Sequence, residues 1–96
     1  VVSSTTTDES TIRVYPNPFT ERLNIEFSSA TDTWAQLEIY SITGSKLETL
    51  FNGPVSRGVM NTVEYIPRLV GSQILFYHLT LNGKNQIGKL IYNERR

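Results

Sequence analysis

The sequence predicts an all-β domain, a seven-stranded immunoglobulin-like antiparallel β-sandwich. Three observations support this fold class. Apolar and polar residues alternate with a period of two along most of the chain, turn-forming residues separate these runs, and no stretch shows a sustained helical period of 3.6 residues. Several short strands with regular turn signals are typical of such a sandwich.

The positions of the expected strands follow from this alternation. Leu23, Ile25 and Phe27 alternate with Asn24 and Glu26, which is the pattern of a strand with one buried face. The other runs are assigned to strands by the same alternation. The ordered domain is expected to begin at Ile12. The strands are expected, in chain order, at residues 12–15, 23–27, 35–39, 47–51, 61–66, 74–81 and 87–92.

Three of these runs carry more specific expectations. The run 74–81 is apolar on both faces apart from His78 and Thr80, so it predicts a central strand. In the last run Ile87 and Ile91 are expected to face the core. Trp34 precedes the inward phase of its strand and is expected to be partly exposed.

Turn-forming residues lie between the runs. Pro16 and Pro18 fix φ and remove backbone donors, which predicts a stiff, non-helical corner between two strands. Gly44 permits a tight turn, and Asn82-Gly83 predicts a type I′ hairpin, whose two central residues both have positive φ. The turn signals are expected, in chain order, at residues 16–18, 28–33, 43–44, 52–54, 67–72 and 82–83.

Length and composition narrow the function classes. The chain has 96 residues, which suits one domain, and its nine basic and nine acidic residues leave no basic stripe for nucleic acid. No apolar run is long enough for a membrane helix, so membrane insertion is not expected. Cysteine is absent, which excludes disulfides and thiolate metal sites. Residues 1–11 are rich in Ser and Thr and predict a flexible linker before a domain at residues 12–96.

No constellation of residues predicts an enzyme, a metal site or a cofactor. His78 is the single histidine and has neither a nucleophile nor an orienting partner in a recognisable signature, so a structural or surface role is expected. The aromatic residues could form a binding platform, which leaves as an alternative an immunoglobulin-like adhesion or spacer module that binds carbohydrate or a neighbouring domain. The carboxylates on the polar phases of strands are read as solvated residues: Glu26, Glu38, Glu48 and Glu64.

Four blocks occur in an order that resembles a known family. They are residues 14–19 (Val-Tyr-Pro-Asn-Pro-Phe), residues 39–46, residues 69–81 and residues 89–92 (Lys-Leu-Ile-Tyr). Together they resemble the type A C-terminal sorting domain of the bacterial type IX secretion system. The chain departs from that family where Gln73-Ile74-Leu75 replaces a Gly-aliphatic-Tyr segment.

The resemblance implies a delivery function. Such domains form the C-terminal part of exported proteins in Bacteroidetes-type bacteria. They reach the periplasm together with their cargo and are then recognised by the outer-membrane translocon. A surface sortase then cuts upstream and joins the cargo to anionic lipopolysaccharide. The domain is therefore expected to be a substrate of the translocon and the sortase, to need no cofactor, and to be secreted or located at the cell surface. Its last strand is expected to be recognised through its main-chain groups, as the edge of a sheet. The candidate sorting-motif residues are Pro16, Asn17, Pro18, Gly44, Gly83, Lys84, Lys89, Leu90, Ile91 and Tyr92.

Overall fold

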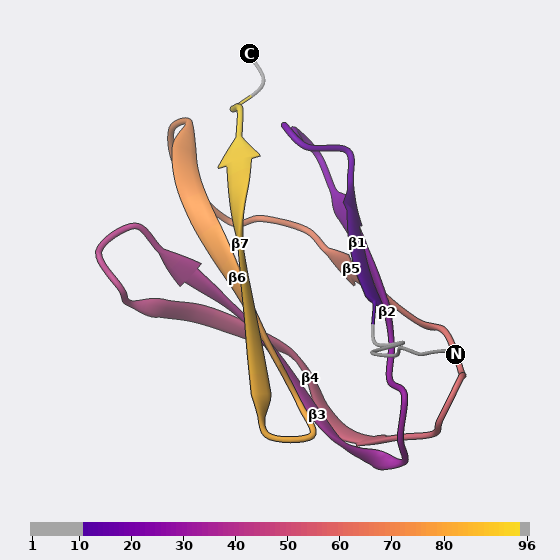
Figure 1. The fold of residues 1–96 in the computed structure, drawn as a ribbon. Coiled ribbons are helices and arrows are strands. Elements are labelled where there is room, and N and C mark those ends of the chain that lie inside the picture. Colours follow the sequence, from indigo (N-terminus) through magenta and orange to yellow (C-terminus); the bar gives the residue numbers. More distant parts are fainter. Residues whose placement is uncertain (1–10, 95–96) are drawn as a thin grey trace, which may run out of the picture.

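Seven antiparallel strands make up the computed structural model, which describes residues 11–94 (Figure 1). Within these residues there is no helix, and the predicted all-β class is confirmed. The strands are, in chain order, β1 Thr11–Tyr15, β2 Leu23–Ser28, β3 Thr33–Ser41, β4 Lys46–Val55, β5 Asn61–Tyr65, β6 Gln73–Leu81 and β7 Lys84–Tyr92.

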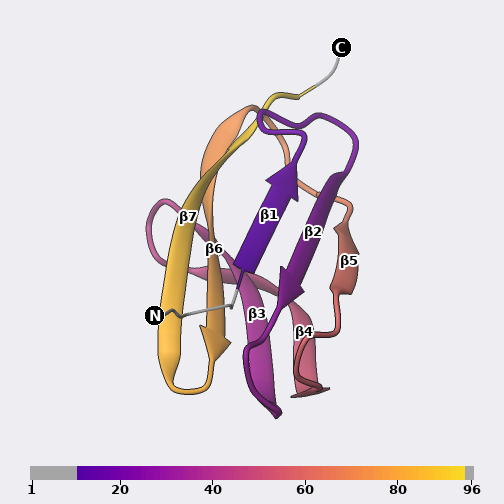
Figure 2. The same cartoon turned by 45° about the vertical axis from the view of Figure 1, so that its right-hand side comes forward.

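The strands form two sheets that pack face to face. One sheet has the order β1-β2-β5 and the other has the order β4-β3-β6-β7. Figure 2 shows β1, β2 and β5 side by side in one layer, with β4, β3, β6 and β7 making the other. The strand β6 pairs with both β3 and β7, as predicted for a central strand.

The core lies between the two sheets and follows the predicted alternation. In β2 and β3 every second side chain is buried, because a strand directs successive side chains to opposite faces. Burial of a large apolar side chain contributes about 1.5–3 kcal/mol. The buried apolar residues are Phe19, Leu23, Ile25, Phe27, Ala35, Leu37, Ile39, Val55, Tyr65, Leu75, Leu79, Leu81, Leu90 and Tyr92.

The predicted inward phase of the last strand is wrong. Leu90 and Tyr92 are buried, whereas Ile87 is 60% exposed. The two-residue turn sets this register, because it places Lys84 opposite Leu81 and thereby brings Leu90 opposite the buried Leu75. Ile87 and Ile91 therefore lie on the outer face, in the opposite phase to Leu90.

Gly88 belongs to the inward phase of the same strand. It lies opposite Tyr77, and a Cβ atom at this position would collide with the Tyr77 ring. The absence of a side chain at Gly88 thus allows an aromatic ring from the neighbouring strand to lie against the backbone of β7.

The expected turn at residues 52–54 is also wrong. Asn52, Gly53 and Pro54 continue β4, which pairs with β3 as far as Val55 and has two register shifts. Proline is tolerated there because β4 is an edge strand. Trp34 lies opposite Pro54 and is 59% exposed, as predicted.

The start of the ordered domain differs slightly from the expected position. Thr11, which the sequence assigned to the linker, is the first residue of β1 and pairs with Ser28. The rest of the predicted linker, residues 1–10, lies outside the described residues.

The turn predictions at the glycines are confirmed. Gly44 has a φ of 93° and Gly83 a φ of 77°, and Asn82 has a φ of 50°, as a type I′ turn requires. Gly44 also donates its backbone N–H to the Ser41 carbonyl at 3.0 Å. Both glycines thus have backbone conformations that other residues rarely adopt.

Alanine at either turn glycine should therefore destabilise the domain. We expect Gly44→Ala and Gly83→Ala each to lower the free energy of unfolding by about 1 kcal/mol, because a Cβ atom disfavours positive φ. The matched control is Gly53→Ala, whose Cβ would meet the Phe51 ring at an ordinary 3.9 Å and whose φ is not positive. Urea denaturation checks the difference. Equal losses in all three variants would show that positive φ is not the cause.

Candidate functional site

The loop between β1 and β2 brings together two of the sequence blocks that resemble the family, residues 14–19 and residues 89–92. The side-chain amide of Asn17 donates a hydrogen bond to the Lys89 carbonyl at 3.1 Å. Its carbonyl oxygen accepts one from the Ile91 backbone N–H at 3.0 Å. Asn17 thus uses both ends of one side chain to pair with the outer edge of β7, in the way that a neighbouring strand would.

Phe19 continues this pairing with its backbone. Its N–H donates to the Ile91 carbonyl at 2.9 Å, and its carbonyl accepts from the Asn93 N–H at 2.9 Å. A parallel bridge joins Phe19 to Tyr92. We call Asn17 and Phe19 the edge clasp, because together they occupy the outer edge of β7 from Lys89 to Asn93.

The Phe19 ring fixes the edge clasp to the core. It is 1% exposed, and its centroid lies 6.2 Å from that of Tyr65 in β5 and 5.4 Å from that of Tyr92 in β7. Because β5 and β7 belong to different sheets, the ring packs at their junction. Burial at this junction raises the pKa of the Tyr65 hydroxyl.

Polar contacts fix the beginning of the same loop. The Tyr15 hydroxyl donates a hydrogen bond to Glu26 Oε2 at 2.6 Å, and Arg13 donates to Oε1 at 2.9 Å. The hydrogen bond between Tyr15 and Glu26 raises the pKa of the Tyr15 hydroxyl and lowers the pKa of the Glu26 carboxyl. The sequence suggested that Glu26 is simply solvated. In the structure it is instead hydrogen-bonded to Arg13 and Tyr15 of β1.

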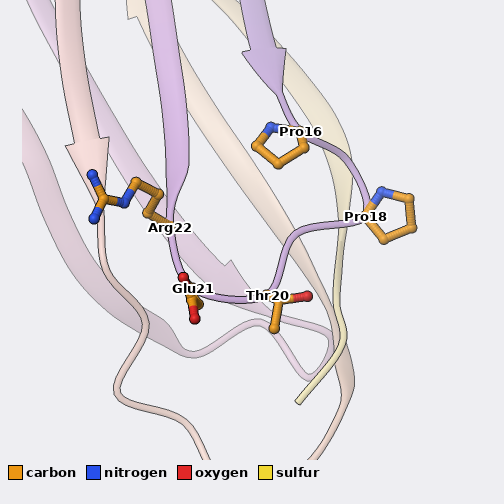
Figure 3. A pocket seen from close by; sticks show the side chains of 5 residues that line it. All are labelled: Pro16, Pro18, Thr20, Glu21 and Arg22. Atoms are coloured by element: carbon orange, nitrogen blue, oxygen red, sulfur yellow. The ribbon is translucent and has the colours of Figure 1, made fainter. Parts of the chain in front are cut away.

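A shallow pocket of about 330 Å³ adjoins the loop and is lined by Pro16, Pro18, Thr20, Glu21 and Arg22. Figure 3 shows the two proline rings on the loop that leaves β1, and Arg22 near the start of β2. The peptide bonds before both prolines are cis. Arg22 donates to Glu64 at 3.2 Å. The lining residues contain one carboxylate and no histidine, so they do not form the acid–base pair that hydrolysis requires.

The predicted motif residues fall into two groups. Asn17 is bonded to Lys89 and Ile91, and Pro16 and Pro18 flank it in the same loop. Gly44 lies in the β3–β4 turn, and Gly83 with Lys84 lies at the β6–β7 turn. Figure 1 shows that the β6–β7 turn and the β1–β2 loop are at opposite ends of the sandwich.

The outer edge of the last strand, which the sequence predicts to be recognised as a sheet edge, is only partly open. From the Lys89 carbonyl to the Asn93 N–H the outward main-chain groups are already bonded to the edge clasp. Leu90 and Tyr92 are buried and are not available to a receptor in the folded domain. The Lys89 side chain is exposed, so that part of the motif remains accessible.

The motif set derived from the sequence omitted two residues that complete this site. These residues are Phe19, which ends the block at residues 14–19, and Asn93, which directly follows the last strand. The aromatic residue directly after the second proline is the available signal for Phe19, because an apolar residue beside a stiff turn tends to be buried. The role of Asn93 depends on its backbone N–H and leaves no signal in the sequence.

Other candidate residues show structural roles. The His78 ring stacks on Tyr40 with centroids 4.1 Å apart, as expected for a cross-strand pair. Glu38 accepts hydrogen bonds from Tyr40 and Lys46. Among residues 11–94 there is no cluster of three metal-ligating acidic, His or Cys side chains. The described residues also contain no helix that could cross a membrane.

Comparison with known families shows the family to which the chain belongs. The model of the family described as the secretion system C-terminal sorting domain matches residues 13–62. The chain belongs to this family. The matched part of the sorting domain contains the Pro16–Phe19 block and Gly44 and ends before β6 and β7. Sorting domains of this type IX family mark proteins that are exported to the cell surface or secreted.

A solved structure supports the fold of the sorting domain. The chain is similar to part of dimeric latent PorU from Porphyromonas gingivalis, with 20% sequence identity and a TM-score of 0.63. The alignment covers 99% of this chain but 10% of the PorU chain, so the similarity concerns a tenth of that protein. No individually curated protein matches the sorting domain.

Loss of the Asn17 side chain should release the outer edge of β7. We expect Asn17→Ala to lower the free energy of unfolding by about 1–2 kcal/mol, because two hydrogen bonds are lost. The direct measurement is amide hydrogen exchange, in which the Ile91 N–H should exchange faster. Asn17→Asp is the matched variant, since it keeps the acceptor for Ile91 and removes the donor to Lys89. Unchanged protection of Ile91 in Asn17→Ala would show that the side chain does not hold this edge.

Proposed function

We propose that the chain is a type A sorting signal that is recognised, as a folded domain, by the outer-membrane translocon of the type IX system. The observation that carries the proposal is the edge clasp, through which the family's opening block holds the last strand in place. Two blocks that are far apart in the sequence thereby form one surface. A receptor that recognises this surface reads the folded domain and not a linear peptide.

The proposal extends to the fate of the domain. The cargo and the domain reach the periplasm together, and a surface sortase cuts within or just upstream of residues 1–11. The cargo is then joined to anionic lipopolysaccharide. In this scheme the sorting domain is a substrate of the sortase and has no catalytic role of its own.

A reporter fusion tests the proposal. A periplasmic signal peptide and a reporter are placed before residues 1–96, and the fusion is expressed in a bacterium that has the type IX system. We expect the reporter at the surface or in the medium. A fusion that lacks residues 12–96 should stay in the periplasm. Equal export with and without the domain would refute a sorting function.

A single substitution tests the accessible part of the motif. Lys89→Ala should leave stability within about 0.5 kcal/mol, because the side chain is exposed. We expect the Lys89→Ala fusion to accumulate in the periplasm although it melts normally. Arg57→Ala, an exposed cationic residue between β4 and β5, is the matched control and should be exported. Normal export of the Lys89→Ala fusion would remove Lys89 from the recognised surface.

A further inference from the structure

The four edge strands of the sandwich differ in how they are protected from pairing with another chain. The strands β1 and β5 are short, with five residues each. The strand β4 has two register shifts and contains Pro54. Short length, irregular register and proline are the usual means of protecting an edge. The strand β7 has nine residues and none of these three features, and among the described residues its own protection consists of the exposed Lys84 and Lys89.

The edge clasp protects only one half of β7. Lys84 and Leu81 flank the two-residue turn and form the first hydrogen-bonded pair of β6 and β7. Counting from Lys84, every second residue of β7 therefore directs its main-chain N–H and C=O groups toward β6. The alternate residues, which include Asn85, Ile87 and Lys89, direct theirs outward. From the Lys89 carbonyl onward the outward groups meet the edge clasp. Among the described residues, no hydrogen bond covers the outward N–H and C=O groups of Asn85 and Ile87.

The side chains along this open half have a consistent chemistry. Ile87 is 60% exposed and shares its face of β7 with the exposed Lys89, whereas the exposed Lys84, beside the turn, is in the opposite phase. Neither lysine takes part in the three ion pairs found within residues 11–94. The open edge therefore offers two sets of main-chain groups, one aliphatic side chain and two uncompensated positive charges.

We propose that the open edge of β7 binds an extended, acidic and aliphatic peptide segment of another protein, which adds to the sheet beside Asn85 and Ile87. Main-chain hydrogen bonds would supply the pairing, and an aliphatic side chain opposite Ile87 with a carboxylate opposite Lys89 would supply the selectivity. The same lysines repel a second basic edge, so they disfavour self-pairing and favour an acidic partner. The turn at one end and the edge clasp at the other restrict the added strand to about five residues.

This binding site goes beyond the proposed sorting function, because it can be tested on the isolated chain without any export. The probe is the blocked pentapeptide Glu-Thr-Ile-Thr-Glu, which, when extended with its Ile opposite Ile87, places one Glu opposite Lys89 on the same face. It is titrated into the ¹⁵N-labelled 96-residue chain, and amide shifts are followed by NMR. We expect saturable shifts at Asn85 and Ile87 and at least tenfold weaker binding of Lys-Thr-Ile-Thr-Lys.

Two protein variants complete the experiment. Ile87→Pro removes the outward N–H, and an edge strand tolerates proline at such a position. Ile87→Glu keeps the N–H but adds a like charge, and it serves if the proline variant does not fold. Each should weaken binding of the acidic peptide at least tenfold. The proposal is overturned by the absence of shifts, by equal binding of both peptides, or by shifts located away from β7. Shifts that depend on protein concentration without peptide would identify a second copy as the occupant and would also overturn it.

Discussion

Replacing Phe19 with alanine should lower the free energy of unfolding by about 3–5 kcal/mol. The ring is 1% exposed and contacts Tyr65 and Tyr92, so its removal leaves a cavity at the junction of the two sheets. This loss is a large fraction of the roughly 5–15 kcal/mol that stabilises a typical domain. Urea denaturation followed by tryptophan fluorescence measures the change.

The control for this prediction is Phe19→Leu, which keeps an apolar side chain at the same position. Its loss should be clearly smaller, because the cavity is smaller while the backbone bonds of Phe19 are unchanged. If alanine at Phe19 costs no more than an exposed substitution, about 0.5 kcal/mol, then the ring does not hold the edge clasp to the core.

Alanine at Leu90 should lower the free energy of unfolding by about 2–5 kcal/mol, whereas alanine at Ile87 should change it by less than about 0.5 kcal/mol. Leu90 is fully buried and Ile87 lies on the outer face, although both are large aliphatic residues of β7. The pair therefore tests the inward phase of the last strand in one comparison. Thermal or urea unfolding of the two variants measures the difference. A larger loss for Ile87→Ala than for Leu90→Ala would show that Ile87 faces the core, as the sequence predicted.

The sequence was sufficient for those features of the fold that depend on local chemistry. The alternation at Leu23, Ile25 and Phe27 predicted the inward face of β2, and Asn82-Gly83 predicted a turn with positive φ. These features depend on residues that are adjacent in the chain, where the period of a strand and the geometry of a turn are decisive.

The phase of β7 could not be predicted in the same way. Ile87 and Ile91 form one apolar set and Leu90 and Tyr92 form another, so alternation alone fits either phase. The pairing with β6 makes the choice, and it also places the ring of Tyr77 over Gly88. Similarly, Pro54 suggested a turn, and only its place on an edge strand explains why β4 continues through it.

The candidate site shows the same division between local and distant information. The block from Pro16 to Pro18 and the block from Lys89 to Tyr92 were both identified as motifs, and the proline corner was predicted correctly. That Asn17 pairs with the edge of β7 could not be predicted, because an asparagine beside prolines is equally suited to bonding within its own turn. The partner is determined by the way the first and last strands meet.

The edge clasp also has a consequence for the order of folding. Its two side-chain hydrogen bonds join residues that are 72 and 74 positions apart, so they contribute strongly to the contact order of the domain. Such contacts form only after the intervening chain has been synthesised and loop closure has been offset by other interactions. An unfinished chain has no last strand to hold, and a complete chain that is only partly folded lacks the clasp and exposes the edge of that strand. The clasp therefore reports that the domain is complete, which is information that neither sequence block contains by itself.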